Sequence, residues 1–213
     1  MMGYSNSLLA AGVLLVGAAF SSQAPAQNND LQPERFLSVT QSLGLIKNVF
    51  LLIDNKAADG CWSNAEQVRK QTQQTLEHSG FTVYDEPLLI LSPLSSNLII
   101  TAQGSRSREG TCYGSIQIES YRSVLDESEG VQIQYQGRNF SQSTVAHGRK
   151  NLNAAFLSAT ATQTTAFTAA VEANRKSPIV SNTFAKLTAQ EIKPLPVRVL
   201  ADVFRNVQAN TPP

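Results

Sequence analysis

The first strong pattern in the chain is the unbroken apolar run from Val49 to Ile53, which belongs to the longer stretch that begins at Leu45. A short continuous apolar run predicts a strand that is buried on both faces. We therefore expect this segment to form the centre of a sheet.

A helical pattern follows this strand after a loop. Small or apolar residues recur at positions 65, 68, 72 and 76, with polar residues between them. This spacing predicts an amphipathic helix that covers one face of the sheet, continues to about Ser79 and stops at Gly80. Ser63 and Glu66 have the S-x-x-E spacing of a capping box, which predicts the start of that helix.

Two later segments alternate strictly between apolar and polar residues. Ile116 and Ile118 alternate with residues 115, 117 and 119, and an equally regular alternation of apolar and glutamine residues runs from 131 to 136. Such alternation predicts antiparallel strands with one wet face, joined by a turn at Asp126–Gly130. Residues 81–84, 88–91 and 98–103 are shorter strand candidates. The exposed row of glutamines, which faces solvent or a partner, comprises Gln132, Gln134 and Gln136.

This order of elements predicts the α+β class. A strand, a helix and then several strands give a mainly antiparallel sheet with a helix packed on it. We assign residues 27–140 to this α+β sandwich domain.

We expect the remaining residues, 141–213, to form a helical extension packed on or beside the sheet. Residues 151–175 have apolar positions near helical spacing, and this long helix could begin as early as Ser141. A weaker helical segment surrounds residues 184–192, and a last helix fits 197–208. The apolar stripe of that last helix includes Leu200 and Phe204, and it either folds back onto the sheet or docks into a partner or a second copy.

The first 26 residues have the pattern of a cleaved signal peptide. Leu8–Phe20 is apolar but too short to span a bilayer, and Ala24-Pro25-Ala26 fits the A-x-A rule for signal peptidase. We predict cleavage after Ala26 and a soluble mature chain that is periplasmic or secreted. No later segment is apolar enough for stable membrane insertion after cleavage.

Composition narrows the classes of function. With 42% hydrophobic and 15% charged residues the chain predicts a globular protein. Its net charge of +1 argues against a strongly basic nucleic-acid binder and against a polybasic membrane-surface protein.

The two cysteines, Cys61 and Cys112, predict one structural disulfide, since an exported chain with a single pair has one connectivity. Closing a loop of roughly 50 residues stabilises the folded state by roughly 4 kcal/mol in the chain-entropy model. Redox catalysis would require a C-x-x-C arrangement, which the sequence lacks. With the cysteines paired and two histidines in the chain, we expect no transition-metal site and no cofactor.

Few other residues suggest chemistry. His147, Arg149 and Lys150 form a small basic cluster that could hold an anion beside a helix start, or could be a solvated basic turn. Arg106 and Arg108 are typical of a charged hairpin tip. The sequence contains no G-x-S-x-G elbow, H-E-x-x-H motif, phosphate-binding loop or dinucleotide fingerprint.

These observations favour an exported non-enzymatic protein, an envelope accessory or binding module. We expect its partner to be an envelope or extracellular protein, contacted through the glutamine row or the C-terminal helices, and a homodimer is a further possibility. The alternative is a small periplasmic or secreted hydrolase that uses His147 with a carboxylate such as Asp85.

Overall fold

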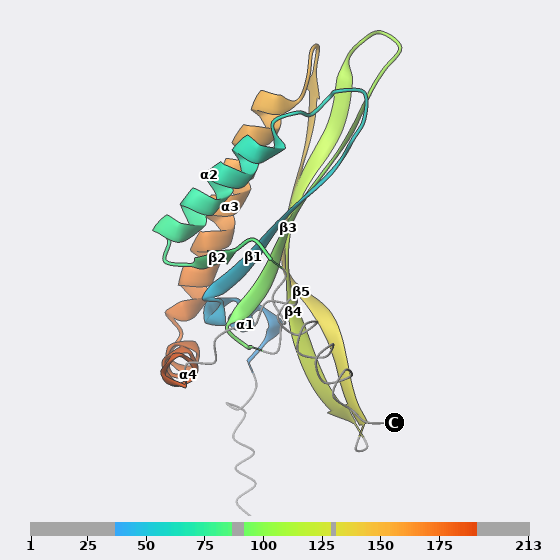
Figure 1. Ribbon diagram of the computed structural model, residues 1–213. Coiled ribbons are helices and arrows are strands. Elements are labelled where there is room, and N and C mark those ends of the chain that lie inside the picture. The colour runs from blue at the N-terminus through green and yellow to red at the C-terminus, as the bar shows by residue number, and fades with distance from the viewer. Residues whose placement is uncertain (1–36, 87–91, 129–130, 191–213) are drawn as a thin grey trace, which may run out of the picture. The chain divides into compact units, whose positions relative to one another are not determined.

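The computed structural model describes residues 37–86, 92–128 and 131–190. In this part of the chain five strands form one sheet in the order β2-β1-β3-β4-β5, and the long helices α2 and α3 lie side by side against it (Figure 1). The strands are β1 (Asn48–Ala57), β2 (Thr82–Tyr84), β3 (Ser95–Arg106), β4 (Cys112–Ser128) and β5 (Val131–Gly148). The helices are α1 (Val39–Ser42), the 3₁₀ turn η2 (Leu43–Leu45), α2 (Ala65–His78), α3 (Asn153–Arg175) and α4 (Pro178–Ala189).

The predicted α+β class with a helical C-terminal part is confirmed, but the sheet is mixed rather than mainly antiparallel. β1 is parallel to both of its neighbours, β2 and β3, and the antiparallel pairs are β3–β4 and β4–β5. The physical reason is the connection between β1 and β2. It contains the whole of α2, and a connection of that length returns the chain to the same end of the sheet.

The predicted strand at residues 49–53 is confirmed as the interior strand β1, but its burial on both faces holds only at its start, where the neighbours Val49 and Phe50 are both buried. Leu51 is fully buried, whereas its neighbour Leu52 is 38% exposed. The alternation arises because α2 and α3 cover the face toward which Leu51 points. From Leu52 onward the opposite face carries no helix within the described residues.

The helix predicted after this strand is α2, and its buried residues are Val68, Thr72 and Leu76, as the spacing predicts. Gly80 follows it with a φ of +82°, which suits a glycine stop. The predicted capping box is wrong. The cap position is Asn64, and the Ser63 hydroxyl instead accepts a hydrogen bond from Asn153 at the start of α3.

The core lies between the sheet and the two long helices. Strand residues on the covered face alternate with exposed ones, and each large apolar side chain buried there contributes on the order of 1.5–3 kcal/mol. Gln163 of α3 also reaches the sheet, where it donates to the Ile116 carbonyl and the Thr144 hydroxyl. The largest fully buried apolar members of this core include Phe156, Phe167, Leu76, Leu98, Ile100, Ile116 and Ile118.

The β4–β5 hairpin is longer than predicted. Residues 126–128, predicted to lie in a turn, are paired with 131–133 in the ladder, so the strands continue almost to the tip. At the other end β5 continues to Gly148. Residues 141–148, which we assigned to the helical extension, are therefore strand, because their pairing to β4 outweighs the helical pattern that begins farther on.

The predicted long helix is confirmed as α3, and its stripe Leu152, Phe156, Gln163, Phe167 and Val171 is buried. α4 begins at Pro178, earlier than predicted, because proline is well suited to the first position of a helix. Arg175 fixes the end of α3 by donating to the carbonyls of Gly44 and Ile46.

Three predictions lie outside the described residues. They are the signal peptide at 1–26, the strand candidate at 88–91, and the last helix with Leu200 and Phe204. Among the described helices, none is both long and apolar enough to cross a bilayer.

Candidate functional site

The predicted disulfide is present and buried. Cys61, just before α2, bonds to Cys112, the first residue of β4, with a Cα–Cα distance of 5.6 Å. Both cysteines have no exposed surface. The bond therefore ties the start of α2 to the sheet, in the structural role that the sequence predicts.

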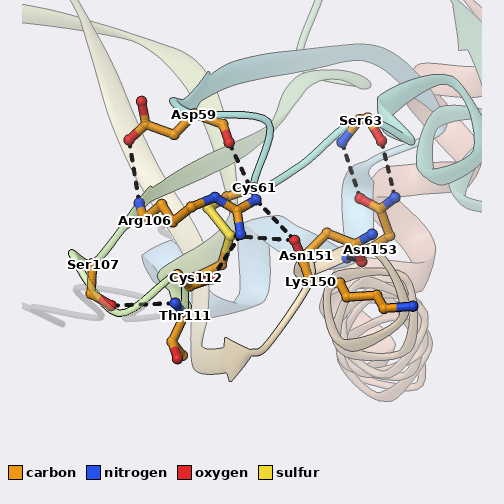
Figure 2. Close-up of a disulfide and its surroundings, with 11 residues drawn as sticks. Asp59, Cys61, Ser63, Arg106, Ser107, Thr111, Cys112, Lys150, Asn151 and Asn153 are labelled. Atoms are coloured by element: carbon orange, nitrogen blue, oxygen red, sulfur yellow. Dashed lines mark hydrogen bonds between the residues drawn. A yellow bond between two sulfur atoms is a disulfide. The ribbon is translucent and has the colours of Figure 1, made fainter.

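Arg106 organises the loops around this disulfide (Figure 2). Its guanidinium donates to the main-chain carbonyls of Gly110, Asp59 and Lys150 at 2.8–3.3 Å. Its own main-chain N–H donates to the Asp59 carboxylate. The predicted position of Arg106 at a hairpin tip is confirmed, because it pairs with Cys112 at the β3–β4 turn. Its role goes beyond that of an ordinary tip residue, since the side chain links its own hairpin to two other loops.

Near the disulfide, the Leu152 side chain packs closely against the backbone of β3 and β4. Gly104 and Gly114 are paired across β3 and β4, and Leu152 lies against both. A Cβ on Gly114 would come within 2.8 Å of the Leu152 side chain and closer still to the sheet backbone. Together with the Ser63–Asn153 pair, this packing fixes the start of α3 beside the start of α2 (Figure 2).

From Leu52 toward the disulfide end, no helix of the described part of the chain covers the opposite face of the sheet, and we call this part the open face. Its side chains are brought together by register. Leu52 aligns with Ile99, Glu119 and Ser141, and the next rows follow at every second residue. The open face consists of Leu52, Asp54, Lys56, Ile99, Thr101, Gln103, Ser105, Tyr113, Ser115, Gln117, Glu119, Ser141, Ser143, Val145 and His147.

The carboxylates of the open face are each paired with a cation. Asp54 bonds to Lys56 at 2.8 Å along β1, and Glu119 bonds to Arg138 at 2.7 Å between β4 and β5. The hydrogen bond and charge of Glu119 raise the pKa of Arg138. Burial raises the pKa of the nearby Tyr121 phenol, and Glu119 raises it further. Away from these two pairs, the open face therefore offers hydroxyl, amide, aliphatic and aromatic groups.

A shallow hollow lies at the disulfide end of the open face. Its volume is about 460 Å³, and its floor is the close-packed backbone of the two glycines. Tyr113 is 53% exposed and Val145 is 82% exposed, and the Tyr113 ring lies 6.2 Å from the His147 ring. The residues lining the hollow are Gln103, Gly104, Ser105, Tyr113, Gly114, Ser115 and Val145.

The predicted basic cluster is divided between this face and a loop. His147 is exposed near the end of β5, and Arg149 and Lys150 are exposed in the turn before α3. The main chain of Lys150 has a structural role, because its carbonyl accepts from Arg106. Whether the cluster binds an anion stays a prediction.

His147 and Asp85 do not meet. Asp85 follows β2 at one edge of the sheet and pairs with Arg69, whereas His147 belongs to β5 at the other edge. Three strands separate these edges, which corresponds to roughly 19 Å at about 4.8 Å per strand. In the described part of the chain, no group of three or more His, Cys, Asp or Glu side chains could hold a metal ion.

The predicted glutamine row belongs to β5. Gln136 is exposed, and the side chains of Gln132 and Gln134 lie outside the part that the structure describes. The open face beyond this row was not predicted as a surface. The strict alternation of residues 115–119 was the signal for it, because alternation indicates one wet face per strand.

One buried cation belongs to the scaffold rather than to this surface. Arg122 is 9% exposed, and burial lowers its pKa to about 10. It donates to the carbonyls of Ser42 and Pro93. It thereby holds α1 and the loop before β3 against the covered side of the sheet.

Comparison with known proteins yields little. No protein-family model and no curated protein matches the chain. Among solved structures the chain is similar to a PelC variant, a dodecamer from Paraburkholderia phytofirmans, with 12% sequence identity and a TM-score of 0.32. The match covers 59% of this chain and 86% of that one. A similarity of this size supports no conclusion about the fold or function of this chain.

Proposed function

We propose that this chain is an exported binding module that contacts an envelope or extracellular protein through the open face. The observation that carries the proposal is the contrast between the two faces of one sheet. One is covered by α2 and α3, and the other presents Tyr113 and Val145 to solvent around a hollow. Exposed aromatic and aliphatic side chains grouped on a structured surface are typical of protein contacts.

The chemistry of this face favours an uncharged, hydrogen-bonding partner surface. Its carboxylates are already paired, and the groups around the hollow are hydroxyls and amides from Ser105, Ser115 and Gln103. Tyrosine at such a position combines apolar area with a hydroxyl at little cost in conformational entropy. We therefore expect the interaction to depend weakly on salt.

Export is the second part of the proposal. The apolar segment and the Ala24-Pro25-Ala26 site support it, and a structural disulfide is typical of proteins that fold in an oxidising compartment. Intact-mass measurement of the protein from its native host should give a chain that begins at Gln27. A mass corresponding to the uncleaved chain would contradict this part.

The binding proposal is tested with the double variant Tyr113→Ala and Val145→Ser. Immobilised mature chain should retain a defined protein from an envelope extract, and the double variant should retain at least about tenfold less. Both positions are exposed, so the variant should fold, which thermal melting verifies.

Val39→Ser is the matched control, since Val39 is 64% exposed on α1, away from the open face. It should retain the partner as well as the unchanged chain does. Equal loss in the control, or equal retention by the double variant, would overturn the proposed binding surface.

A further inference from the structure

The outer strand β5 has a free edge. It is paired with β4 on one side and is the last strand of the sheet in the described residues. Within those residues the main chain of β5 forms its hydrogen bonds with β4. Because alternate residues of an edge strand point their N–H and C=O groups outward, about half of its backbone groups are available for another strand.

This edge lacks most of the features that protect sheet edges. Proteins usually block a free edge with lysine, proline, inward-pointing charges or a very short strand. β5 runs from Val131 to Gly148 and contains no Lys, Pro, Asp or Glu. Its one full charge, Arg138, is paired with Glu119 of the same chain.

A bulge in the β4–β5 ladder limits the part of β5 that can pair with another strand. The register shifts at Ser120/Tyr121, and the ladder is regular from there to the end of β5, over Phe140–Gly148. That segment spans about 30 Å at ~3.4 Å per residue. It has exposed side chains at Ser141, Ser143, Val145 and His147 and no acidic, Lys or Arg residue, so two copies can approach without repulsion between full charges.

We propose that two copies of this chain pair antiparallel along Phe140–Gly148 and form one continuous sheet. A second copy is the occupant that the chemistry favours, because this edge is neutral and equally suited to itself under twofold symmetry. Such an interface is isologous, so it closes at the dimer. The pairing does not depend on the binding partner proposed above.

The geometry of antiparallel pairing determines how the two open faces are arranged. Residues whose main-chain N–H and C=O groups point away from β4 can form hydrogen bonds only with the equivalent residues of the other copy. Two residues that lie directly opposite each other in the new ladder have their side chains on the same face of the sheet. Ser143 and Val145 of both copies therefore lie on one side. The dimer doubles the open face and keeps the helices of both copies on the opposite side.

Light scattering of the full mature chain tests the pairing. The unchanged chain should have twice the mass of one chain. The double variant Ser143→Lys and Val145→Lys, which places charges from both copies at the junction, should raise the dimer dissociation constant by at least about tenfold. Ser105→Lys is the matched control, since Ser105 is exposed on the same face but belongs to β3, and it should remain dimeric.

A cross-linking experiment distinguishes this edge from any other dimer contact. Ser143→Cys should be joined to its counterpart by a short bis-maleimide, and Ser105→Cys, two strands away from the edge, should not. If the unchanged protein has the mass of one chain at every concentration, the proposal is overturned. This holds whether the edge is then empty or occupied by another segment or protein. A dimer that is unaffected by the lysines, or equal cross-linking at both positions, would overturn it as well.

Discussion

The two faces of this sheet come from the same strands and have opposite properties. On the covered face Leu51, Ile100 and Ile116 are fully buried beneath α2 and α3. On the open face their immediate neighbours include Leu52, Thr101 and Ser115, which are exposed or half-buried. Since neighbours in a strand alternate between faces, the stability of the fold and its surface chemistry are encoded in interleaved positions.

Substitutions on the two faces should therefore have different effects. Changes on the covered face should alter the free energy of unfolding, because they remove buried area or leave cavities. Changes on the open face should leave that free energy nearly unchanged and alter association. At the disulfide end the two faces are linked through the backbone of Gly104 and Gly114. These glycines pack against Leu152 on the covered face and form the floor of the hollow on the open face.

The largest effect should come from Phe156→Ala on α3. Phe156 is fully buried and packs edge-on against Trp62 at 5.9 Å between ring centroids. Its removal should lower the free energy of unfolding by about 3–5 kcal/mol through lost burial and a residual cavity. Urea unfolding of both proteins measures this, and a loss below about 1 kcal/mol would mean that the helix is not held as the structure shows.

Removal of the disulfide should have the next largest effect. A Cys61→Ala and Cys112→Ala double variant frees a loop with a sequence separation of 51 residues. We expect a loss of about 2–4 kcal/mol, because the unfolded chain gains conformational entropy. Differential scanning calorimetry should detect it. An unchanged melting temperature would show that the contacts of Arg106 and Leu152 alone hold this end together.

Arg106→Met tests the loop contacts separately from the disulfide. The methionine keeps much of the apolar stem but leaves three main-chain carbonyls without their donor. The expected loss is about 1–3 kcal/mol. Arg108→Met, at an exposed position two residues farther on, should have little effect on stability. Equal losses for the two variants would argue against the special role of Arg106.

The smallest effect should come from Val145→Ser on the open face. Val145 is 82% exposed, so its replacement should change the free energy of unfolding by no more than about 0.5 kcal/mol. Chemical denaturation alongside Phe156→Ala gives the direct contrast between the faces. A loss of 2 kcal/mol or more would show that this residue is covered and that the face is not open.

The sequence predicted the elements with strong periodicity well. The stripe of α3, the inward face of α2 and the alternation of β4 follow from spacing alone, and the pairing of Cys61 with Cys112 follows from their number. The periodic patterns depend only on residues close together in the sequence, and two cysteines can form only one pair.

The missed features depend on contacts between distant segments. The parallel pairing of β1 with β3 is a matter of topology, which hydrophobic spacing does not encode. Ser63 has the spacing of a capping residue, yet Asn153, far along the chain, binds its hydroxyl. The role of Arg106 was missed for the same reason, since its acceptors lie on three loops. The open face could be inferred strand by strand, but its assembly requires the register of β1, β3, β4 and β5.

Photo-cross-linking in the producing cells tests the central claim, that the open face binds a partner, most directly. The photoreactive amino acid p-benzoyl-phenylalanine would replace Ser115 on the open face or, as a control, Glu172, which is exposed on α3. We expect an adduct with a second protein from position 115, none from position 172, and loss of the adduct when Tyr113→Ala is added. An adduct from position 172 alone, or one from position 115 that is unaffected by Tyr113→Ala, would contradict the account.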